Sequence, residues 1–307
     1  MNALRCGALV GLLALGACAV GPDFKRPEPP HVDRYVPGAP PSGSDAQRFI
    51  DGRPVPADWW SAFGSPELDA IVAEALRANP TVAAAQAALK QARETYAAQR
   101  GAYFPTVAVS GDASRNRNAV QVLSPTLTSG EALYNLYTAN ISVAYTLDLF
   151  GANRRAVESL GALADAGRFQ LDATYLTVAG NVVVAAIQQA GLAAQVEATE
   201  RTIALGRESL GVLKRQFELG SIARLDVAAQ EAALAQLEGS LPPLRRQLEA
   251  TRHLLAVLTG KLPADAPTES FSLASLSLPA EIPLGVPAEL VNRRPDVRAA
   301  EAELHAA

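Results

Sequence analysis

Few residues of this chain have the types and spacing that catalysis or metal binding needs. There are two cysteines, Cys6 and Cys18, and three histidines, His31, His253 and His305. His31 lies in a proline-rich stretch, far in sequence from the other two. The sequence contains no Cys-x-x-Cys, His-Glu-x-x-His or Gly-x-Ser-x-Gly motif and no glycine-rich phosphate loop. We therefore expect no enzymatic site, no metal and no cofactor.

Cys18 is the residue whose surroundings do indicate a chemical modification. Arg5 supplies a positive charge, and residues 7–15 form an apolar run that is shorter than the ~20 residues of a membrane-spanning helix. The run ends in Leu-Gly-Ala-Cys, which resembles the bacterial lipobox, where the cysteine becomes the acylated N-terminus. We predict a signal peptide over 1–17 and a lipid on Cys18. The alternative is a plain signal peptide with an accidental cysteine.

The residues around Cys18 indicate where the mature chain would go. Cys6 lies in the segment that would be removed, so one acylated cysteine would remain and no disulfide would form. Ala19 follows Cys18, where an aspartate would favour retention in the inner membrane, so the outer membrane is the expected location. Residues 18–63 are rich in proline, and we expect them to form an extended lipid-anchored segment instead of a helix or packed strand.

Composition favours helices for the rest of the chain. Hydrophobic residues make up 49% of the 307 residues, many of them alanine, and aromatic residues make up only 6%. Alanine is the best helix former, so the fold class is predicted to be mostly α with a small β part. The net charge of −4, from 27 basic and 31 acidic residues, gives no electrostatic basis for binding nucleic acid.

Two cap signals and two alternating runs open the body of the chain. Ser65-Pro66 and Asn79-Pro80 each predict a helix start, for helices ending near 78 and 100. Residues 106–114 and 138–148 then alternate apolar and polar side chains over the length of a tilted membrane-spanning strand. Aromatic residues lie near the ends of these runs, as in an interfacial girdle: Tyr103, Phe104, Tyr134, Tyr137 and Phe150. An ordinary surface hairpin would show the same alternation.

Two long helical stretches follow. Residues 152–219 contain no proline and repeat apolar residues every three to four positions, which predicts one helix about 100 Å long. Such a helix belongs in a coiled coil or a tube. Gly220-Ser221 breaks it, and a return helix is predicted over 223–259, kinked or split by Pro242-Pro243. Residues 261–283 are expected to form a loop.

An internal repeat is the last organisational signal. The pattern Pro-x-Val-x-Ala-Ala-x-Ala-x-Leu occurs at 80–89 and again at 295–304. The matching proline and helix-start contexts favour a true repeat over chance. We therefore predict a first repeat over 64–283 and the start of a second, truncated repeat over 284–307.

Several stretches, taken together in their order along the sequence, resemble the outer membrane factor family of TolC-like ducts, in particular its NodT-type lipoprotein branch. The matching stretches are Cys18–Phe24, Trp59–Phe63, Pro66–Leu68, Ala75–Pro80, Leu147–Gly151, Gly220–Asp226, Leu254–Gly260 and Arg293–Val297. The resemblance implies a homotrimer whose strands close a β-barrel in the outer membrane and whose helices form a periplasmic tunnel. It also implies two partners, a periplasmic adaptor and an inner-membrane RND-type pump.

The resemblance also assigns roles at the turn between the long helices. Gly220, Ser221, Ile222 and Ala223 would meet the adaptor, and Asp226 would take part in the polar links that keep the duct closed, with Arg224 nearby. Capping of the return helix is the alternative for Asp226. For the whole chain, the leading hypothesis is a passive exit duct for small molecules. The alternatives are a non-functional fragment of such a duct and a periplasmic coiled-coil scaffold lipoprotein.

Overall fold

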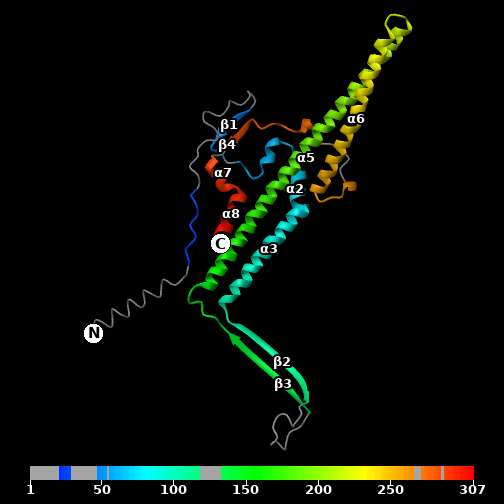
Figure 1. Ribbon diagram of the computed structural model, residues 1–307. Helices are drawn as coiled ribbons and strands as arrows, with labels where there is room; N and C mark the ends of the chain where they lie inside the picture. The colour runs from blue at the N-terminus through cyan, green and yellow to red at the C-terminus, as the bar shows by residue number, and fades with distance from the viewer. Residues whose placement is uncertain (1–20, 29–46, 54, 118–132, 266–270, 285–286) are drawn as a thin grey trace, which may run out of the picture. The chain divides into compact units, whose positions relative to one another are not determined.

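The computed structural model describes residues 21–28, 47–53, 55–117, 133–265, 271–284 and 287–307 (Figure 1). The predicted signal peptide, Cys18 and His31 lie outside these residues. The chain divides into two compact units. Unit 1 comprises Met1–Lys25, Ala92–Ala164 and His305–Ala307, and unit 2 comprises Arg26–Gln91 and Asp165–Leu304.

Helix starts follow the local signals in the sequence. The helix α2, Pro66–Ala78, begins after Ser65, whose hydroxyl accepts a hydrogen bond from the Leu68 N–H at 3.3 Å. The helix α3, Pro80–Arg100, begins after Asn79, whose side-chain oxygen accepts from the Thr81 N–H at 2.8 Å. The fixed φ of proline suits the first helical turn, and a cap of this kind stabilises a helix by roughly 1 kcal/mol.

The core of unit 2 joins α2 to two long helices, α5, Ala152–Glu218, and α6, Arg224–Leu258. Its buried members are alanine, valine and leucine, with one phenylalanine at the edge: Leu68, Val72, Ala75, Val178, Val182, Ala186, Leu255 and Phe271 among others. Full burial of a valine or leucine contributes about 1.5–3 kcal/mol, so this cluster holds the helices together. Lys261 and Glu74 add an ion pair at 2.9 Å beside it.

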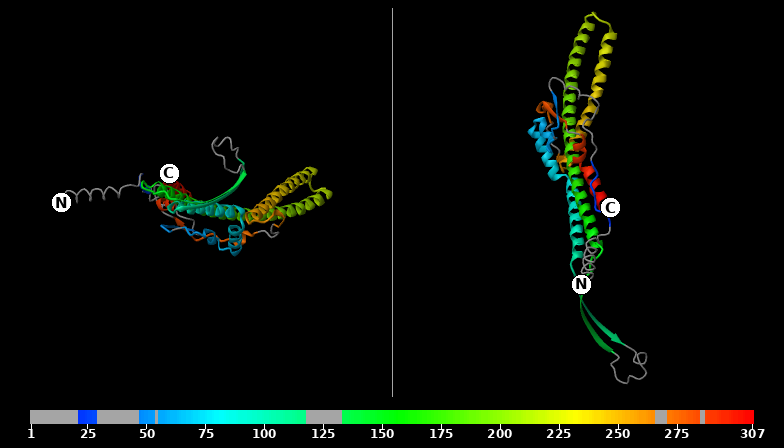
Figure 2. Two further views of the ribbon diagram at one scale, coloured as in Figure 1. Left: turned by 90° about the horizontal axis from the view of Figure 1, so that it is seen from below. Right: turned by 90° about the vertical axis from the view of Figure 1, so that its left-hand side faces the viewer.

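Beyond this core, α5 and α6 run side by side and antiparallel to a turn (Figures 1 and 2). Their seam buries Ile203, Val227 and Leu234. Three cross-helix ion pairs flank the seam: Lys214–Glu231 at 2.8 Å, Arg207–Glu238 at 2.7 Å and Arg245–Glu200 at 2.6 Å. Small side chains let the helices approach, since the δ-carbon of Leu234 lies 3.3 Å from the point where a Cβ on Gly206 would stand.

Pro242-Pro243 were predicted to kink or split the return helix. They do not split it, because α6 is continuous from Arg224 to Leu258. Both prolines lie on the exposed side of the helix, so water can solvate the carbonyls that lose their N–H partners. The ion pairs of Glu238 and Arg245 hold α6 against α5 on either side of the prolines. Packing therefore outweighs the local preference.

Unit 2 also contains a two-stranded parallel sheet that the sequence analysis missed. The strand β1, Arg48–Asp51, pairs with β4, Glu281–Leu284. Arg48 and Arg53 both contact the carboxylate of Glu281, at 3.3 and 2.9 Å. The proline-rich segment is thus not wholly an extended linker. The chain then continues through α7, Pro287–Arg293, to α8, Pro295–Ala306, which buries Ala299 and Ala302.

Unit 1 contains an antiparallel hairpin of β2, Thr106–Arg117, and β3, Leu133–Ala144. The last turns of α3 and the first turns of α5 complete the unit and touch where the Tyr96 ring lies 3.3 Å from the place of a Cβ on Gly161. By length and composition, α5 is the one described helix that is apolar enough to cross a membrane. However, 44% of its most apolar window is buried inside the protein, which accounts for much of that apolarity.

Candidate functional site

The hairpin brings the predicted apolar positions of its two strands onto one face. Directly opposite residues of an antiparallel pair lie on the same side of the sheet. Val107 is opposite Val143, and Val109 is opposite Ile141. These side chains are exposed to between 63% and 77% of their full area. The described part of the chain therefore does not cover this apolar face.

The opposite face of the hairpin is polar in its first half. Here Ala108 is opposite Ser142, Ser110 is opposite Asn140, and Asp112 is opposite Thr138. Each strand is 12 residues long, which is more than the roughly 9–11 residues that a tilted strand needs to cross a bilayer. The hairpin thus has the length and the two-faced character of a membrane-barrel segment.

The predicted strand limits, 106–114 and 138–148, differ from the observed ones. The second strand ends at Ala144, because the register would set Tyr145 opposite Pro105, which has no N–H to continue the ladder. Asp148 instead caps α5, accepting hydrogen bonds from the N–H groups of Asn153 and Arg154 at 3.2 and 2.9 Å. The prediction that Tyr145 and Leu147 belong to the strand is therefore wrong.

At the other end the hairpin extends beyond the prediction, to Arg117 and Leu133. The alternation is lost there, since Arg115 and Arg117 fall on the apolar face, but cross-strand pairing continues. The aromatic residues fall into two groups. Tyr103, Phe104 and Phe150 lie outside the strands, next to the helices, while Tyr134 and Tyr137 lie in β3. Tyr137 is on the apolar face, opposite Ala113.

The second candidate site is the turn between α5 and α6, here called the tip, residues 219–226. Gly220 has φ of 74°, a left-handed conformation that glycine adopts without strain. Its N–H donates to the Phe217 carbonyl, and the Ser221 N–H donates to the Gln216 carbonyl, both at 2.9 Å. This is the Schellman arrangement that ends a helix sharply. The four predicted turn residues, Gly220 to Ala223, all lie between the two helices.

Asp226 has a capping contact at the tip. Its carboxylate accepts a hydrogen bond from the Ala223 N–H at 3.1 Å, and the Asp226 N–H donates to the Ala223 carbonyl at 3.1 Å. Alanine offers no side-chain acceptor, so only one half of a capping box is present. Within the single protomer this geometry matches the capping alternative for Asp226. Arg224, the other gate candidate, lies exposed in the first turn of α6.

The tip also exposes two leucines that the sequence analysis did not select. Leu219 is 83% exposed and Leu225 is 77% exposed, on either side of the turn. Leucine at the free end of a helical hairpin gains little burial from the described chain, so these two side chains add exposed apolar area to the tip. The available signal was the occurrence of leucine directly beside the helix-ending Gly220.

Among the residues that the structure describes, no group of three or more His, Cys, Asp or Glu side chains could hold a metal ion. His253 is exposed on α6, and His305 lies in unit 1 near the end of α8. Within the described residues, the candidate functional sites are therefore the hairpin of β2 and β3 and the tip between α5 and α6.

Comparison with known proteins identifies the family. The family model described as outer membrane efflux protein matches residues 71–261, more than half of the chain. The chain belongs to the outer membrane efflux protein family. This confirms the family resemblance seen in the sequence and the expected outer-membrane location.

Individual relatives of this outer membrane efflux protein agree. The pyoverdine export outer membrane protein OpmQ of Pseudomonas putida is 32% identical over 96% of this chain and 61% of OpmQ. Nodulation protein T of Rhizobium leguminosarum bv. trifolii is 26% identical over 95% of this chain and 60% of that protein. The solved outer-membrane channel OprN matches with a TM-score of 0.78 and 28% identity, over 94% of this chain and 62% of OprN.

These matches confirm the predicted fold class, mostly helical with a small β part. The chain spans about 60% of the length of the relatives it matches. The repeat boundaries, the lipid on Cys18 and the roles of the tip residues remain predictions.

Proposed function

We propose that this outer membrane efflux protein is an exit duct, which passes small molecules from an inner-membrane RND-type pump to the exterior. Membership of the family supports this proposal, as does the similarity to OpmQ, a protein named for export of pyoverdine. The observation that carries it is the hairpin register, which aligns Val107 with Val143 and Val109 with Ile141 on one exposed face.

In this proposal the apolar face meets lipid and the polar face, with Ser110 and Asn140, lines the pore. A lone hairpin has two edges with unpaired N–H and C=O groups, and lipid cannot hydrogen-bond to them. The edges of β2 and β3 must therefore pair with further strands to close a barrel. We propose that the second repeat, whose start is predicted at 284–307, and two more copies of the full protein in a homotrimer supply them.

The tip is proposed to meet the periplasmic adaptor. Gly220, Ser221, Ile222 and Ala223 form the turn, and the exposed Leu219 and Leu225 supply apolar area beside it. Asp226 and Arg224 are proposed to form polar links with neighbouring helices in the closed duct, in addition to the capping contact of Asp226. Specific recognition of a transported molecule is not assigned to any residue.

The lipid anchor on Cys18 is tested by labelling with a fatty-acid analogue. Cys18→Ser should abolish the label and leave an uncleaved or mis-sorted precursor, whereas Cys6→Ser should change neither. Unchanged labelling of the Cys18→Ser protein would reject the anchor. Complete loss of transport is not expected, because a closed barrel holds itself in the membrane.

The barrel is tested by heat-modifiable mobility in SDS gels. A β-barrel resists SDS until heated, so unheated protein from outer membranes should migrate differently from boiled protein. A coiled-coil scaffold lipoprotein has no reason to form strands of membrane length and would migrate identically in both samples. Identical mobility would therefore favour the scaffold over the duct.

A further inference from the structure

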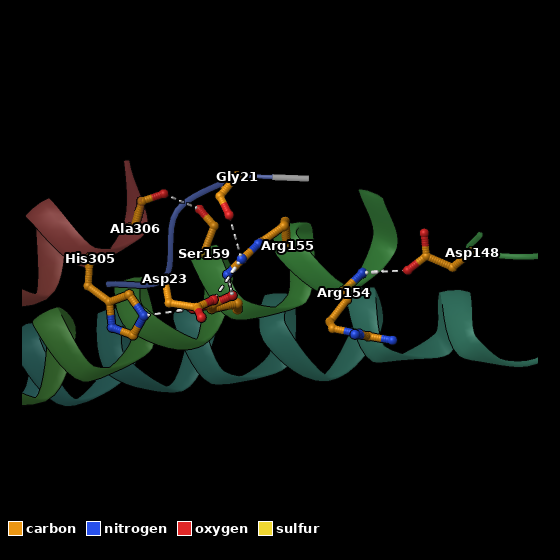
Figure 3. Close-up of polar contacts among 9 residues, drawn as sticks. Gly21, Asp23, Asp148, Arg154, Arg155, Ser159, His305 and Ala306 are labelled. Carbon is orange, nitrogen blue, oxygen red and sulfur yellow. Dashed lines mark hydrogen bonds and ion pairs between the residues drawn. The ribbon is translucent and has the colours of Figure 1, made fainter. Parts of the chain in front are cut away.

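Three segments far apart in sequence meet in unit 1: residues 21–24, the first turns of α5, and the end of α8 (Figure 3). Arg155 of α5 is the centre of the contact. Its guanidinium donates to Asp23 at 2.8 Å, to Glu158 at 2.7 Å and to the backbone carbonyl of Gly21 at 3.2 Å. We call residues 21–24 the strap and these contacts the clamp.

Helix stability does not explain an arginine at position 155. The first turn of α5 contains no acidic residue, and a positive charge there opposes the helix dipole. The free N–H groups at this end are served by Asp148, which bonds to Asn153 and Arg154. The charge of Arg155 therefore destabilises the start of the helix, and its ion pairs with Asp23 and Glu158 offset that cost.

The strap is held on its other side by the end of α8. The ring of Phe24 stacks on that of His305, with centroids 4.3 Å apart and planes 14° apart. His305 Nε2 lies 3.0 Å from Glu158, and the Ser159 hydroxyl donates to the Ala306 carbonyl at 2.7 Å. The hydrogen bonds from His305 and Arg155 lower the pKa of Glu158, so its carboxylate stays charged.

The backbone of the strap is adapted to this contact at Gly21. Its φ of 117° lies in a region that side-chain-bearing residues rarely adopt, and its carbonyl is the one that accepts from Arg155. A substitution at Gly21 would strain the chain where it meets Arg155, without changing any charge.

We propose that Arg155 is a positioning residue that clamps the strap and thereby holds the lipid anchor beside the base of the hairpin. The inference rests on the proposed lipid at Cys18. Three residues separate Cys18 from Gly21, a reach of at most about 10 Å. Without the clamp, the next strap contact is the stacking of Phe24 on His305, six residues from Cys18 and a reach of up to about 22 Å.

Exposed apolar side chains lie near the clamp, where an acyl chain could contact them. Leu149 and Phe150 lie just before α5, separated from it by Gly151, and they are 67% and 68% exposed. They lie between the hairpin strand β3 and the helix turn that carries Arg155. An anchor restricted to this neighbourhood would place its acyl chains at the same membrane surface as the hairpin base.

Trypsin can test the clamp, because Lys25 directly follows the strap and the next bond, Arg26–Pro27, resists cleavage. The protein is kept in its native membranes, and cleavage after Lys25 is followed by the appearance of a new N-terminus at Arg26. Arg155→Gln and Gly21→Ala should each raise the initial rate about fivefold, since cleavage follows the population of the released strap. Arg154→Gln is the matched control, because Arg154 bonds Asp148 through its backbone N–H (Figure 3).

Equal rates for Arg155→Gln and Arg154→Gln would overturn the clamp. A fatty acid that carries a diazirine tests the anchor position in the same samples. In the wild-type protein its cross-links should concentrate in the tryptic peptide 118–154, and Arg155→Gln should reduce them at least about twofold; an unchanged yield would also overturn the proposal. Absence of any label on wild-type Cys18 would instead contradict the anchor itself, which is a separate failure.

Discussion

The helical core of unit 2 and the hairpin of unit 1 use the same kinds of apolar side chain in opposite ways. Val182 of α5 is fully buried against other helices of its own chain, whereas Val109 of β2 is 77% exposed. Val183 and Ile141 show the same contrast, at 2% and 71%. An exposed β-branched residue stabilises nothing by itself, so these hairpin side chains gain no burial from the described part of the chain.

The tip belongs with the hairpin in this comparison. Leu219 and Leu225 are as exposed as the hairpin valines, although they lie at the end of a helix pair whose seam is well packed. The helical core thus buries its apolar residues within the described chain, whereas the hairpin and the tip leave theirs exposed. Mutations of buried core residues should therefore change the free energy of unfolding more than mutations of exposed hairpin or tip residues.

The largest expected effect concerns the core. Leu68→Ala removes a fully buried side chain of α2 and should lower the free energy of unfolding by about 2–5 kcal/mol. Val109→Ala should lower it by less than about 1 kcal/mol, because that side chain is 77% exposed among the residues that the structure describes. Circular dichroism at 222 nm during chemical unfolding measures both. Equal losses would remove the distinction between core and hairpin.

Two glycines in equivalent helix-ending turns give a sharper test. Gly260 and Gly220 have φ of 73° and 74°. A Cβ on Gly260 would meet the backbone carbonyl of Ala78, whereas a Cβ on Gly220 would meet nothing within 4 Å. Gly220→Ala should therefore cost only the left-handed strain, about 1–2 kcal/mol. Gly260→Ala should cost clearly more, and a smaller shift in its thermal unfolding midpoint than for Gly220→Ala would contradict the packing described at Ala78.

At the tip, Asp226→Asn separates capping from gating. Asparagine caps a helix about as well as aspartate, so the free energy of unfolding should change by less than about 0.5 kcal/mol. If Asp226 also forms charged links to neighbouring helices, the resting conductance of a full-length duct that carries Asp226→Asn should rise in a planar bilayer. Wild-type values for both stability and closed-state conductance would exclude a gating role for Asp226.

The smallest expected effect is a pH dependence of the strap contact. The pKa of Glu158 lies below its ordinary value of 4.5, so its contribution to stability is complete above that pH and is lost as the pH falls through the lowered pKa. Between pH 5 and pH 3, the thermal unfolding midpoint should fall slightly more for the wild-type protein than for Glu158→Gln. Parallel decreases would show that Glu158 does not contribute in this range.

The sequence predicted the helical part well, because its signals are local. Ser65-Pro66 and Asn79-Pro80 begin helices at the expected positions, and α5 ends one residue before the expected 219. The outcome at Pro242-Pro243 was not predictable from local preference, since contacts of Glu238 and Arg245 with α5 hold that helix together. The β1–β4 pair was missed because each strand has four residues and the partners lie more than 200 residues apart.

The hairpin was predicted in kind but not in its limits. Alternation identified the segments around Val109 and Val143, but only the register reveals that Pro105 ends the ladder at Ala144. The clamp was missed for a related reason. Asp23, Arg155 and His305 are ordinary polar residues in three distant segments, and nothing in their spacing indicates that they meet. Contacts of this kind follow from the tertiary fold and not from periodicity.

The central claim is that the hairpin faces lipid on one side and an aqueous pore on the other. Adjacent residues of β3 test it, because Val143 and Ser142 lie on opposite faces of the same strand. Arginine on a lipid face costs up to roughly 2–4 kcal/mol, less towards the membrane surface, whereas arginine in a pore is tolerated. Comparing how much folded, heat-modifiable Val143→Arg and Ser142→Arg protein reaches the outer membrane should show a deficit for Val143→Arg alone. Equal amounts of the two variants would contradict the account.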